Sequence, residues 1–198
     1  DKVLHPERKT MGVLSYLALE GATSRSKIAG LLWAESDERT ARNNLVQVIR
    51  RLKKATDTNL VLGDDLLSLS GEVKTDAAEL KILAFADDEK LLTFTGELLG
   101  PHDYDDCPDF ADWLFSERER ILDLRQNTLK NLIGQHQKAS NYQEALHCAE
   151  ALLLLDTISE EAHRLVMRLH FLAGDRAAAL RAFEKCKAVL DKELSVEP

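Results

Sequence analysis

The residues best suited to chemical recognition lie between Glu38 and Ala55. At about 100° per residue, apolar side chains fall on one side of a helix there, while almost only Arg, Asn, Gln and Lys, with Val46 among them, fall on the other. Arg can offer paired hydrogen bonds to guanine, Asn or Gln can do so to adenine, and Lys neutralises phosphate. The predicted DNA-contacting residues of this helix are Arg39, Arg42, Asn43, Gln47, Arg50, Lys53 and Lys54.

A second group of polar residues, Ser24 and Arg25, stands at the start of a shorter helix. Free backbone N–H groups at a helix N-terminus favour a phosphate, so we expect these two residues to contact DNA as well. Plainer interpretations stay open, because Ser also caps helices and a basic side can simply face water. An ordinary solvated face mixes both signs of charge, and the side of the longer helix after Glu38 carries no carboxylate. That difference favours DNA contact.

The segments that position these residues follow one another as three helices and a hairpin. Apolar periodicity and capping residues predict helices over 9–20, from Thr23 and Ser24 to about 35, and over 38–55, then strands over 60–62 and 66–69. The strand-like runs flank Gly63-Asp64-Asp65, a turn sequence. This order predicts a winged helix-turn-helix domain over residues 1–72.

Beyond residue 72 the pattern is helical. Asp76 and Glu79 resemble a capping box, and the predicted elements are a helix over 77–86, a short helix over 89–94, a loop over 96–108 and a long helix over 109–138 that only Gly134 interrupts. The last seventy residues repeat at an offset of 34, which is the tetratricopeptide period. That offset pairs Leu132 with Val166, Ala145 with Ala179, Ala149 with Phe183, and Ser140-Asn141 with Gly174-Asp175. The sequence therefore predicts a mainly α protein, whose residues 73–198 form an all-α, tetratricopeptide-like helical domain.

Charge is distributed unevenly along the 198 residues, whose net charge is -8. Through Thr56, eleven Lys and Arg residues face six Asp and Glu residues, giving +5; the remainder has fifteen against twenty-eight, giving -13. Such asymmetry indicates a polyanion-binding head on an acidic body. No apolar run approaches the roughly 18 residues that span a bilayer, and the first ten residues lack a secretory signal. We expect a cytoplasmic protein with no membrane contact.

Other chemistry finds little support. The run Asp103-x-Asp105-Asp106 lacks the Gly of a calcium loop, and Leu114 stands where the bidentate Glu should be. Three widely spaced cysteines, Cys107, Cys148 and Cys186, form no zinc motif. Nucleophile elbows, phosphate loops and dinucleotide fingerprints are missing from the sequence. We therefore expect no enzyme activity, no catalytic residue, no metal and no cofactor.

Several segments resemble SARP-type regulators, the antibiotic regulatory proteins of bacteria. In the first part these are Arg8-Lys9, Leu17-Ala18-Leu19-Glu20-Gly21, Ser24-Arg25, Leu31-Leu32-Trp33 and Ala41-Arg42-Asn43-Asn44-Leu45. The bacterial transcriptional activation domain of that family is resembled by Gly96-Glu97-Leu98-Leu99, Phe110 to Trp113, Glu117-Arg118-Glu119-Arg120 and Ala182 to Cys186 with Glu193 to Pro198. The resemblance implies an OmpR-type winged helix whose third helix enters the major groove and contacts DNA through Arg42, Asn43, Gln47 and Arg50. The chain departs from that pattern at its acidic turn 63–65, which offers no cation to a minor groove.

The sequence thus predicts a sequence-specific DNA-binding transcriptional activator. Its expected partners are double-stranded DNA, RNA polymerase or another regulatory domain, and a second copy in a homodimer on DNA. An alternative interpretation is a tetratricopeptide-like interaction or scaffold module of a larger signalling protein that does not bind DNA.

Overall fold

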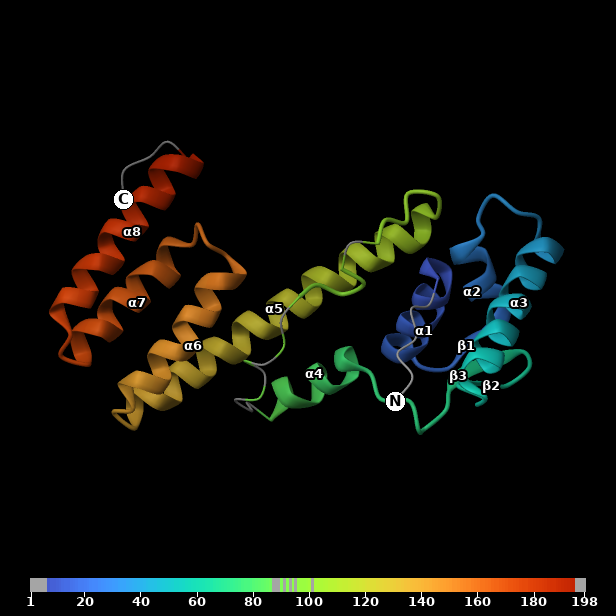
Figure 1. Cartoon of the computed structure of the whole chain (residues 1–198), viewed down its shortest axis with the longest axis horizontal. Helices are drawn as coiled ribbons and strands as arrows, with labels where there is room; N and C mark the ends of the chain where they lie inside the picture. The colour runs from blue at the N-terminus through green and yellow to red at the C-terminus, as the bar shows by residue number, and fades with distance from the viewer. Residues whose placement is uncertain are drawn as a thin grey trace. The chain divides into compact units, whose positions relative to one another are not determined.

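The computed structural model describes residues 7–86, 90, 92, 94, 96–100 and 102–194. The chain is mainly helical, as predicted, with a small sheet in its first part (Figure 1). The predicted short helix over 89–94 falls largely outside the described residues. The elements are α1 (Arg8–Glu20), β1 (Thr23–Ser24), α2 (Arg25–Leu32), α3 (Glu38–Thr56), β2 (Val61–Leu62), β3 (Leu66–Leu69), α4 (Asp76–Phe85), α5 (Pro108–Lys138), α6 (Tyr142–Leu155), α7 (Glu160–Leu172) and α8 (Arg176–Leu194).

Side-chain caps start the two helices that matter most for the predicted interface. Ser24 Oγ accepts a hydrogen bond of 3.3 Å from the backbone N–H of Lys27 at the start of α2. Asp37 Oδ1 accepts one of 3.0 Å from the backbone N–H of Thr40 at the start of α3, and hydrogen bonding by Thr40 lowers the pKa of Asp37. Each cap satisfies an N–H group that the helix itself leaves unpaired. The predicted starts of both helices are confirmed.

Two helix boundaries differ from the sequence-based prediction. Helix α2 ends at Leu32 instead of near residue 35, because Trp33 has φ -135° and ψ 50°, outside the helical region. Helix α4 is capped by Thr75, whose hydroxyl accepts a 3.2 Å hydrogen bond from the backbone N–H of Ala78. The predicted capping box of Asp76 with Glu79 is therefore wrong, since the cap stands one residue earlier.

The three strands form an antiparallel sheet in the order β1–β3–β2. Thr23 of β1 lies opposite Leu67 of β3, and Val61 of β2 lies opposite Leu69 of β3. The hairpin of β2 and β3 confirms the two predicted strand runs. Strand β1 is not expected from the sequence, because two residues are too short to show the alternation that identifies a strand.

One hydrophobic core holds these first elements together, and it extends beyond residue 72. Residues with almost no exposure include Val13, Ile28, Leu32, Leu45 and Leu67 from α1 to α3 and β3. The same cluster contains Leu99, Tyr104, Cys107, Phe110 and Leu114, which come from the loop before α5 and from its first turns. The most apolar part of that loop and helix therefore completes the core of the first three helices.

Phe110 is central to this packing. Its ring centroid lies 4.6 Å from that of Tyr104 and 5.0 Å from that of Trp113, and it is fully buried. Tilted aromatic pairs at these separations add to the gain from burial. Across the contact stands Gly12 of α1, where an added Cβ would lie 3.2 Å from the Phe110 ring and 3.0 Å from Leu32. A glycine at this position lets α1 approach the ring closely.

Contacts divide the chain into two compact units. The first, here called the head unit, comprises Asp1–Lys81 and Thr95–Arg120; the second, here called the helical unit, comprises Ile82–Phe94 and Ile121–Pro198. The expected division after residue 72 concerns how the chain folds and stays a prediction. In the structure, residues 99–114 contribute to the core of the head unit.

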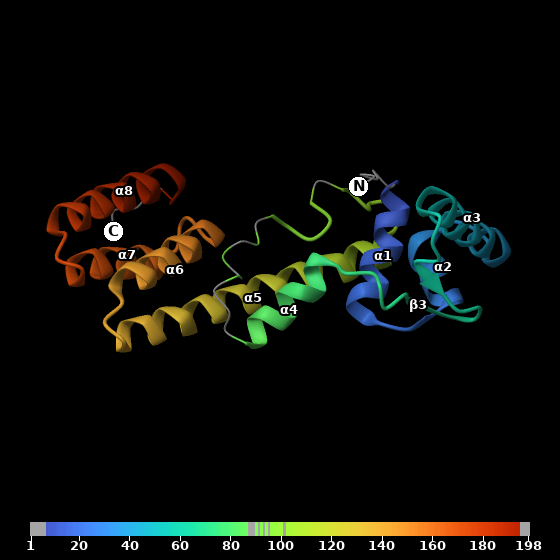
Figure 2. The same cartoon turned by 60° about the horizontal axis from the view of Figure 1, so that its bottom comes forward.

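In the helical unit, α7 packs against both α6 and α8 (Figure 2). The predicted helix over 109–138 is confirmed as α5, which continues through Gly134 without a break. The turns 139–141 and 173–175 share one hydrogen-bond pattern at the 34-residue offset. Ser140 N–H donates to Gln137 O at 3.1 Å where Gly174 N–H donates to Phe171 O at 3.0 Å, and Ser140 and Gly174 have φ of 60° and 87°. The two turns of the sequence repeat therefore have the same backbone conformation.

Side chains follow the repeat less closely than the backbone does. Ala145 and Ala149 are fully buried, whereas Ala179 is half-buried and Phe183 is 41% exposed. Helix α8 packs against α7, and in the described part of the chain no later helix covers the side of α8 that carries Phe183. The pairing of Ala149 with Phe183 is thus equivalent in sequence register but not in environment.

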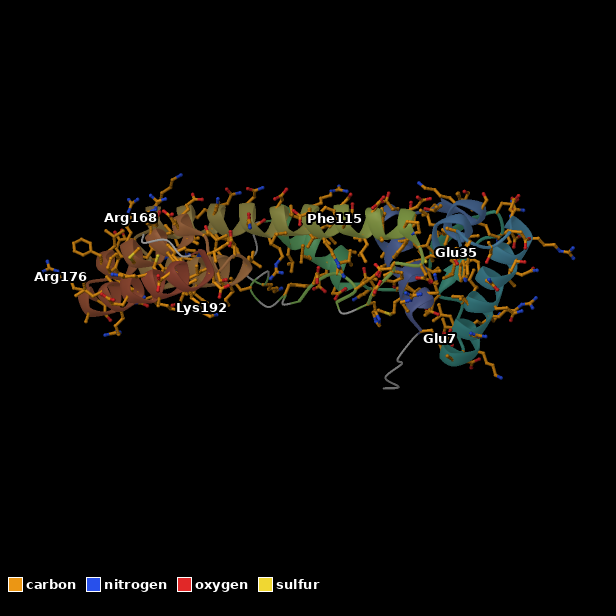
Figure 3. All side chains as sticks on the ribbon, turned by 90° about the horizontal axis from the view of Figure 1, so that it is seen from above. Glu7, Glu35, Phe115, Arg168, Arg176 and Lys192 are labelled. Atoms are coloured by element: carbon orange, nitrogen blue, oxygen red, sulfur yellow. The ribbon has the colours of Figure 1, made fainter. Side chains whose placement is uncertain are left out.

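Replacing Phe110 by Ala should destabilise the head unit by about 3–5 kcal/mol, because the fully buried ring leaves a cavity. Phe115 is 66% exposed on the same helix (Figure 3), so Phe115→Ala should change stability by less than about 0.5 kcal/mol. The two tryptophans, Trp33 and Trp113, both lie in the head unit, so denaturant unfolding followed by their fluorescence reports on this unit. Equal midpoints for the two variants would contradict the role given to Phe110.

Substitutions at the two equivalent positions of positive φ, 140 and 174, should change the stability of the helical unit in opposite directions. Gly174→Ala should destabilise the helical unit by about 1 kcal/mol, because a residue with a Cβ is strained at positive φ. No atom lies within 4 Å of the added Cβ, so the loss comes from the backbone alone. Ser140→Gly removes the same strain and should stabilise the unit by up to about 1 kcal/mol. Thermal unfolding followed by far-ultraviolet circular dichroism tests both, and shifts of the same sign would contradict the shared turn geometry.

Candidate nucleic-acid interface

Helix α3 buries one side and exposes the other, as its sequence predicts. The buried side consists of Ala41, Leu45, Val48 and Leu52. The exposed side carries Arg39, Asn43, Gln47, Arg50, Lys53 and Lys54. None of these six side chains forms an ion pair or hydrogen bond with a residue that the structure describes. We call this side of α3 the basic face; its six cations and amides are free to meet a ligand.

Two further arginines of α3 are paired. Arg42 Nη2 lies 2.7 Å from Glu38 Oε1, one helical turn earlier, and both side chains are at least half exposed. Arg51 Nη1 lies 3.1 Å from Glu7 Oε2, so Arg51 is directed toward the residue just before α1. Exposed pairs of this kind contribute little to stability, and the Arg42 pair can exchange its partner for a stronger anion. Arg42 therefore stands beside the basic face with its guanidinium held by a carboxylate.

Arg25 has a structural task that the sequence does not reveal. Its backbone N–H donates to Asp65 O at 2.8 Å and its Nε donates to Asp64 O at 2.6 Å. The side chain thereby fixes the β2–β3 turn to the start of α2. The hydroxyl of Ser24, its neighbour, caps α2 by accepting the hydrogen bond from the backbone N–H of Lys27. Both residues therefore organise the head unit, and the predicted contact of their side chains with phosphate stays a prediction.

The acidic loop before α5, residues 103–107, is attached to α1 by ion pairs and hydrogen bonds. Arg8 Nη2 and Lys9 Nζ lie 2.7 Å and 2.8 Å from the carboxylate of Asp106. The hydroxyl of Tyr104 donates to the backbone oxygen of Arg8 at 2.7 Å. Lys9 also donates to the backbone oxygen of Leu32 at 2.6 Å and contacts the thiol of Cys107. We call this loop, residues 103–107, the clamp, because it ties the start of α5 to α1. Among the described residues, no cluster of His, Cys, Asp and Glu suits a metal ion.

Electrostatics of the clamp follow from these contacts. Hydrogen bonding from Lys9, together with that from Arg8, holds the pKa of Asp106 well below its usual range. Burial raises the pKa of the Cys107 thiol and raises the pKa of Tyr104 to about 12. At neutral pH the clamp therefore holds a carboxylate against two cations, beside a neutral thiol and a neutral phenol.

Asp106→Asn should destabilise the head unit at pH 7 by about 0.5–1 kcal/mol, a modest loss because half-exposed pairs are screened by water. The folded pKa lies below the unfolded value of about 3.9, so the contribution is complete above that pH and declines as pH falls toward the folded pKa. Denaturant unfolding at pH 7 and pH 3 should therefore show a smaller difference from wild type at pH 3.

The matched control for this clamp is Asp105→Asn. Its hydrogen bond with Asp103 raises the pKa of Asp105, so its charge opposes folding at neutral pH. Removing that charge should leave stability unchanged or slightly higher at pH 7. A loss equal to that of Asp106→Asn would contradict the pairing with Arg8 and Lys9.

Comparison with protein families identifies a bacterial transcriptional activator domain over residues 88–198, more than half of the chain. A comparison with curated proteins gave no match. Among the described residues, no helix combines the length and apolar character needed to cross a membrane. The matched segment includes the clamp and the first turns of α5 as well as α6, α7 and α8. The chain therefore belongs to the family of proteins that carry the bacterial transcriptional activator domain.

Proposed function

We propose that this protein is a sequence-specific DNA-binding transcriptional activator of the SARP type, and that α3 reads the major groove. The observation that carries the proposal is the basic face: four kinds of base-reading or phosphate-binding side chain, all exposed and unpaired within the described structure, on a helix whose other side is buried. Arg, Asn and Gln are the side chains that read base edges in the major groove, and Arg and Lys neutralise phosphates.

The arrangement of the head unit supports an OmpR-type winged helix-turn-helix. Its order is helix, strand, helix, helix, strand, strand, and α2 packs against α3. In helix-turn-helix proteins the second helix of such a pair enters the major groove and its first turns meet the bases. On that arrangement Arg39 and Asn43, from the first turns of α3, contact bases, and Lys53 and Lys54 at its far end contact phosphates. Gln47 and Arg50 lie between the two groups and are also proposed to contact bases.

The β2–β3 turn contributes little to DNA binding in this proposal. Its tip is Gly63-Asp64-Asp65, which would place two carboxylates toward phosphates if it entered a groove. Arg25 holds the backbone of the tip against α2, so the guanidinium nearest the turn is already engaged. Recognition by the head unit then depends on α3, with the wing as a support for the fold.

The helical unit is proposed to contact RNA polymerase or another regulatory domain. Its helical hairpins, α7–α8 among them, repeat at the tetratricopeptide period, and such hairpins serve as interaction surfaces. This unit carries eleven Lys and Arg residues against fourteen Asp and Glu residues, a net charge of -3, so it has no excess of cations to attract the DNA polyanion. The two functions are thereby assigned to different parts of the sequence.

Base-reading and phosphate-binding residues should respond differently to substitution. Asn43→Ala or Arg50→Ala should weaken binding to a site selected from random duplexes by about 1–3 kcal/mol and relax preference at one or two base pairs. Lys53→Ala and Lys54→Ala should weaken binding to all duplexes alike and lower the salt dependence by roughly one unit each. Titrations of labelled duplex at two salt concentrations measure both effects.

Arg51→Ala is the matched control, because Arg51 is exposed on the same helix but pairs with Glu7. It should keep the sequence preference of the wild type. Unchanged affinity in the Asn43 and Arg50 variants, or no binding of the wild type to any duplex, would reject the proposed function in favour of a scaffold without DNA binding.

A further inference from the structure

Val46 is the one bulky apolar residue of α3 that the core does not use. Leu45, Val48 and Leu52 are buried in the head core, and Ile49 packs against it. Val46 is half-buried and does not belong to that cluster or pack on its edge. The partial burial of the Val46 side chain therefore does not come from packing against the head core, and core packing does not explain why this residue is apolar.

The neighbours of Val46 belong to the candidate interface. Residues four apart lie above one another on a helix, which places Val46 in one row with Arg42 and Arg50. Asn43 and Gln47, also proposed to read bases, lie three residues before it and one after it. Val46 thus lies between Arg42 and Arg50 in one helical row, on a side of α3 that is otherwise polar.

A valine at position 46 gives α3 no local advantage. Its branched Cβ restricts the side chain in a helix, so Val is a poorer helix former than Ala, Gln or Lys. For helix formation alone, a half-buried position outside the core would be served better by any of those three. The residue type therefore points to an apolar group that the helix meets only when it is bound.

We propose that Val46 contacts the C5-methyl group of a thymine in the major groove and makes the protein select thymine at that position; this inference rests on the proposed function. In the major groove, thymine alone of the four bases presents a methyl group, and apolar side chains recognise it by contact. Arg42 or Arg50, one turn away, reads a neighbouring guanine by its paired donors. The preferred site then contains a thymine close to a guanine, read by adjacent residues of one helical row.

The test replaces single methyl groups in the DNA. A duplex selected from a random pool by the wild-type chain is resynthesised with deoxyuridine in place of each thymidine in turn, which removes the methyl group and keeps every hydrogen-bonding group. Wild-type protein should bind about three- to five-fold more weakly when one particular thymine loses its methyl group, the loss expected for one buried methyl contact.

Val46→Ala should bind the thymine site about three- to five-fold more weakly than wild type and be indifferent to deoxyuridine at that same position. The matched control is Asn44→Ala, which changes the same helix outside the row and should keep the methyl dependence of the wild type. Thermal unfolding of both variants verifies that α3 remains folded; Ala is tolerated in a helix at either position.

Three results would overturn the inference. These are a selected site without a thymine preference, a wild type insensitive to every deoxyuridine, or a Val46→Ala variant that keeps the full methyl dependence. In each of them the wild type still binds duplex DNA and the proposed function stands. Failure of the wild type to bind any duplex is a different outcome, which rejects the proposed function together with the inference.

Discussion

Burial of Phe110 is the interaction on which the rest of the head unit depends. Three helices of 13, 8 and 19 residues and a sheet with strands of two to four residues offer a small core, and small domains bury too little of their surface to be stable with ease. The ring of Phe110, with Tyr104 and Cys107, supplies apolar volume that α1 to α3 lack by themselves. Gly12 admits the ring by having no side chain of its own. Because Phe110 packs against α1, the core that α1 shares with α2 and α3 is complete. The apolar side of α3 is buried in that core, so its basic face is directed outward.

The elements that the sequence predicts well are those with a local signal. The two-sided pattern of α3, the cap at Asp37 and the turn at Gly63 to Asp65 each lie within a few residues, and the repeat of Ser140 at Gly174 lies within one period. Contacts between distant residues were not predictable in the same way. Nothing adjacent to Asp106 indicates that its partners are Arg8 and Lys9, ninety-seven residues or more away, and β1 exists only because β3 accepts it. The sequence shows the acidic run of the clamp, but only the folded structure shows which cations pair with it.

Sequence family and packing divide this chain differently. The activator-domain match begins at residue 88, yet residues 99–114 within it complete the core of the unit that carries the basic face. A domain recognised by its sequence is therefore not the same as a unit that buries its own core. For an activator this sharing has a physical consequence: residues that belong to the activator family by sequence contribute directly to the stability of the proposed DNA reader.

The basic face also has a consequence for how such proteins diverge. Its side chains at 39, 43, 47 and 50 take no part in the core and have no partners within the described structure, so exchanging them removes no packing and leaves no buried group unsatisfied. If α3 reads DNA as proposed, operator preference and folding stability are inherited through separate sets of positions. Duplicated copies of such a gene could acquire new target promoters by a few surface substitutions, with the scaffold beneath them unchanged and no intermediate that fails to fold.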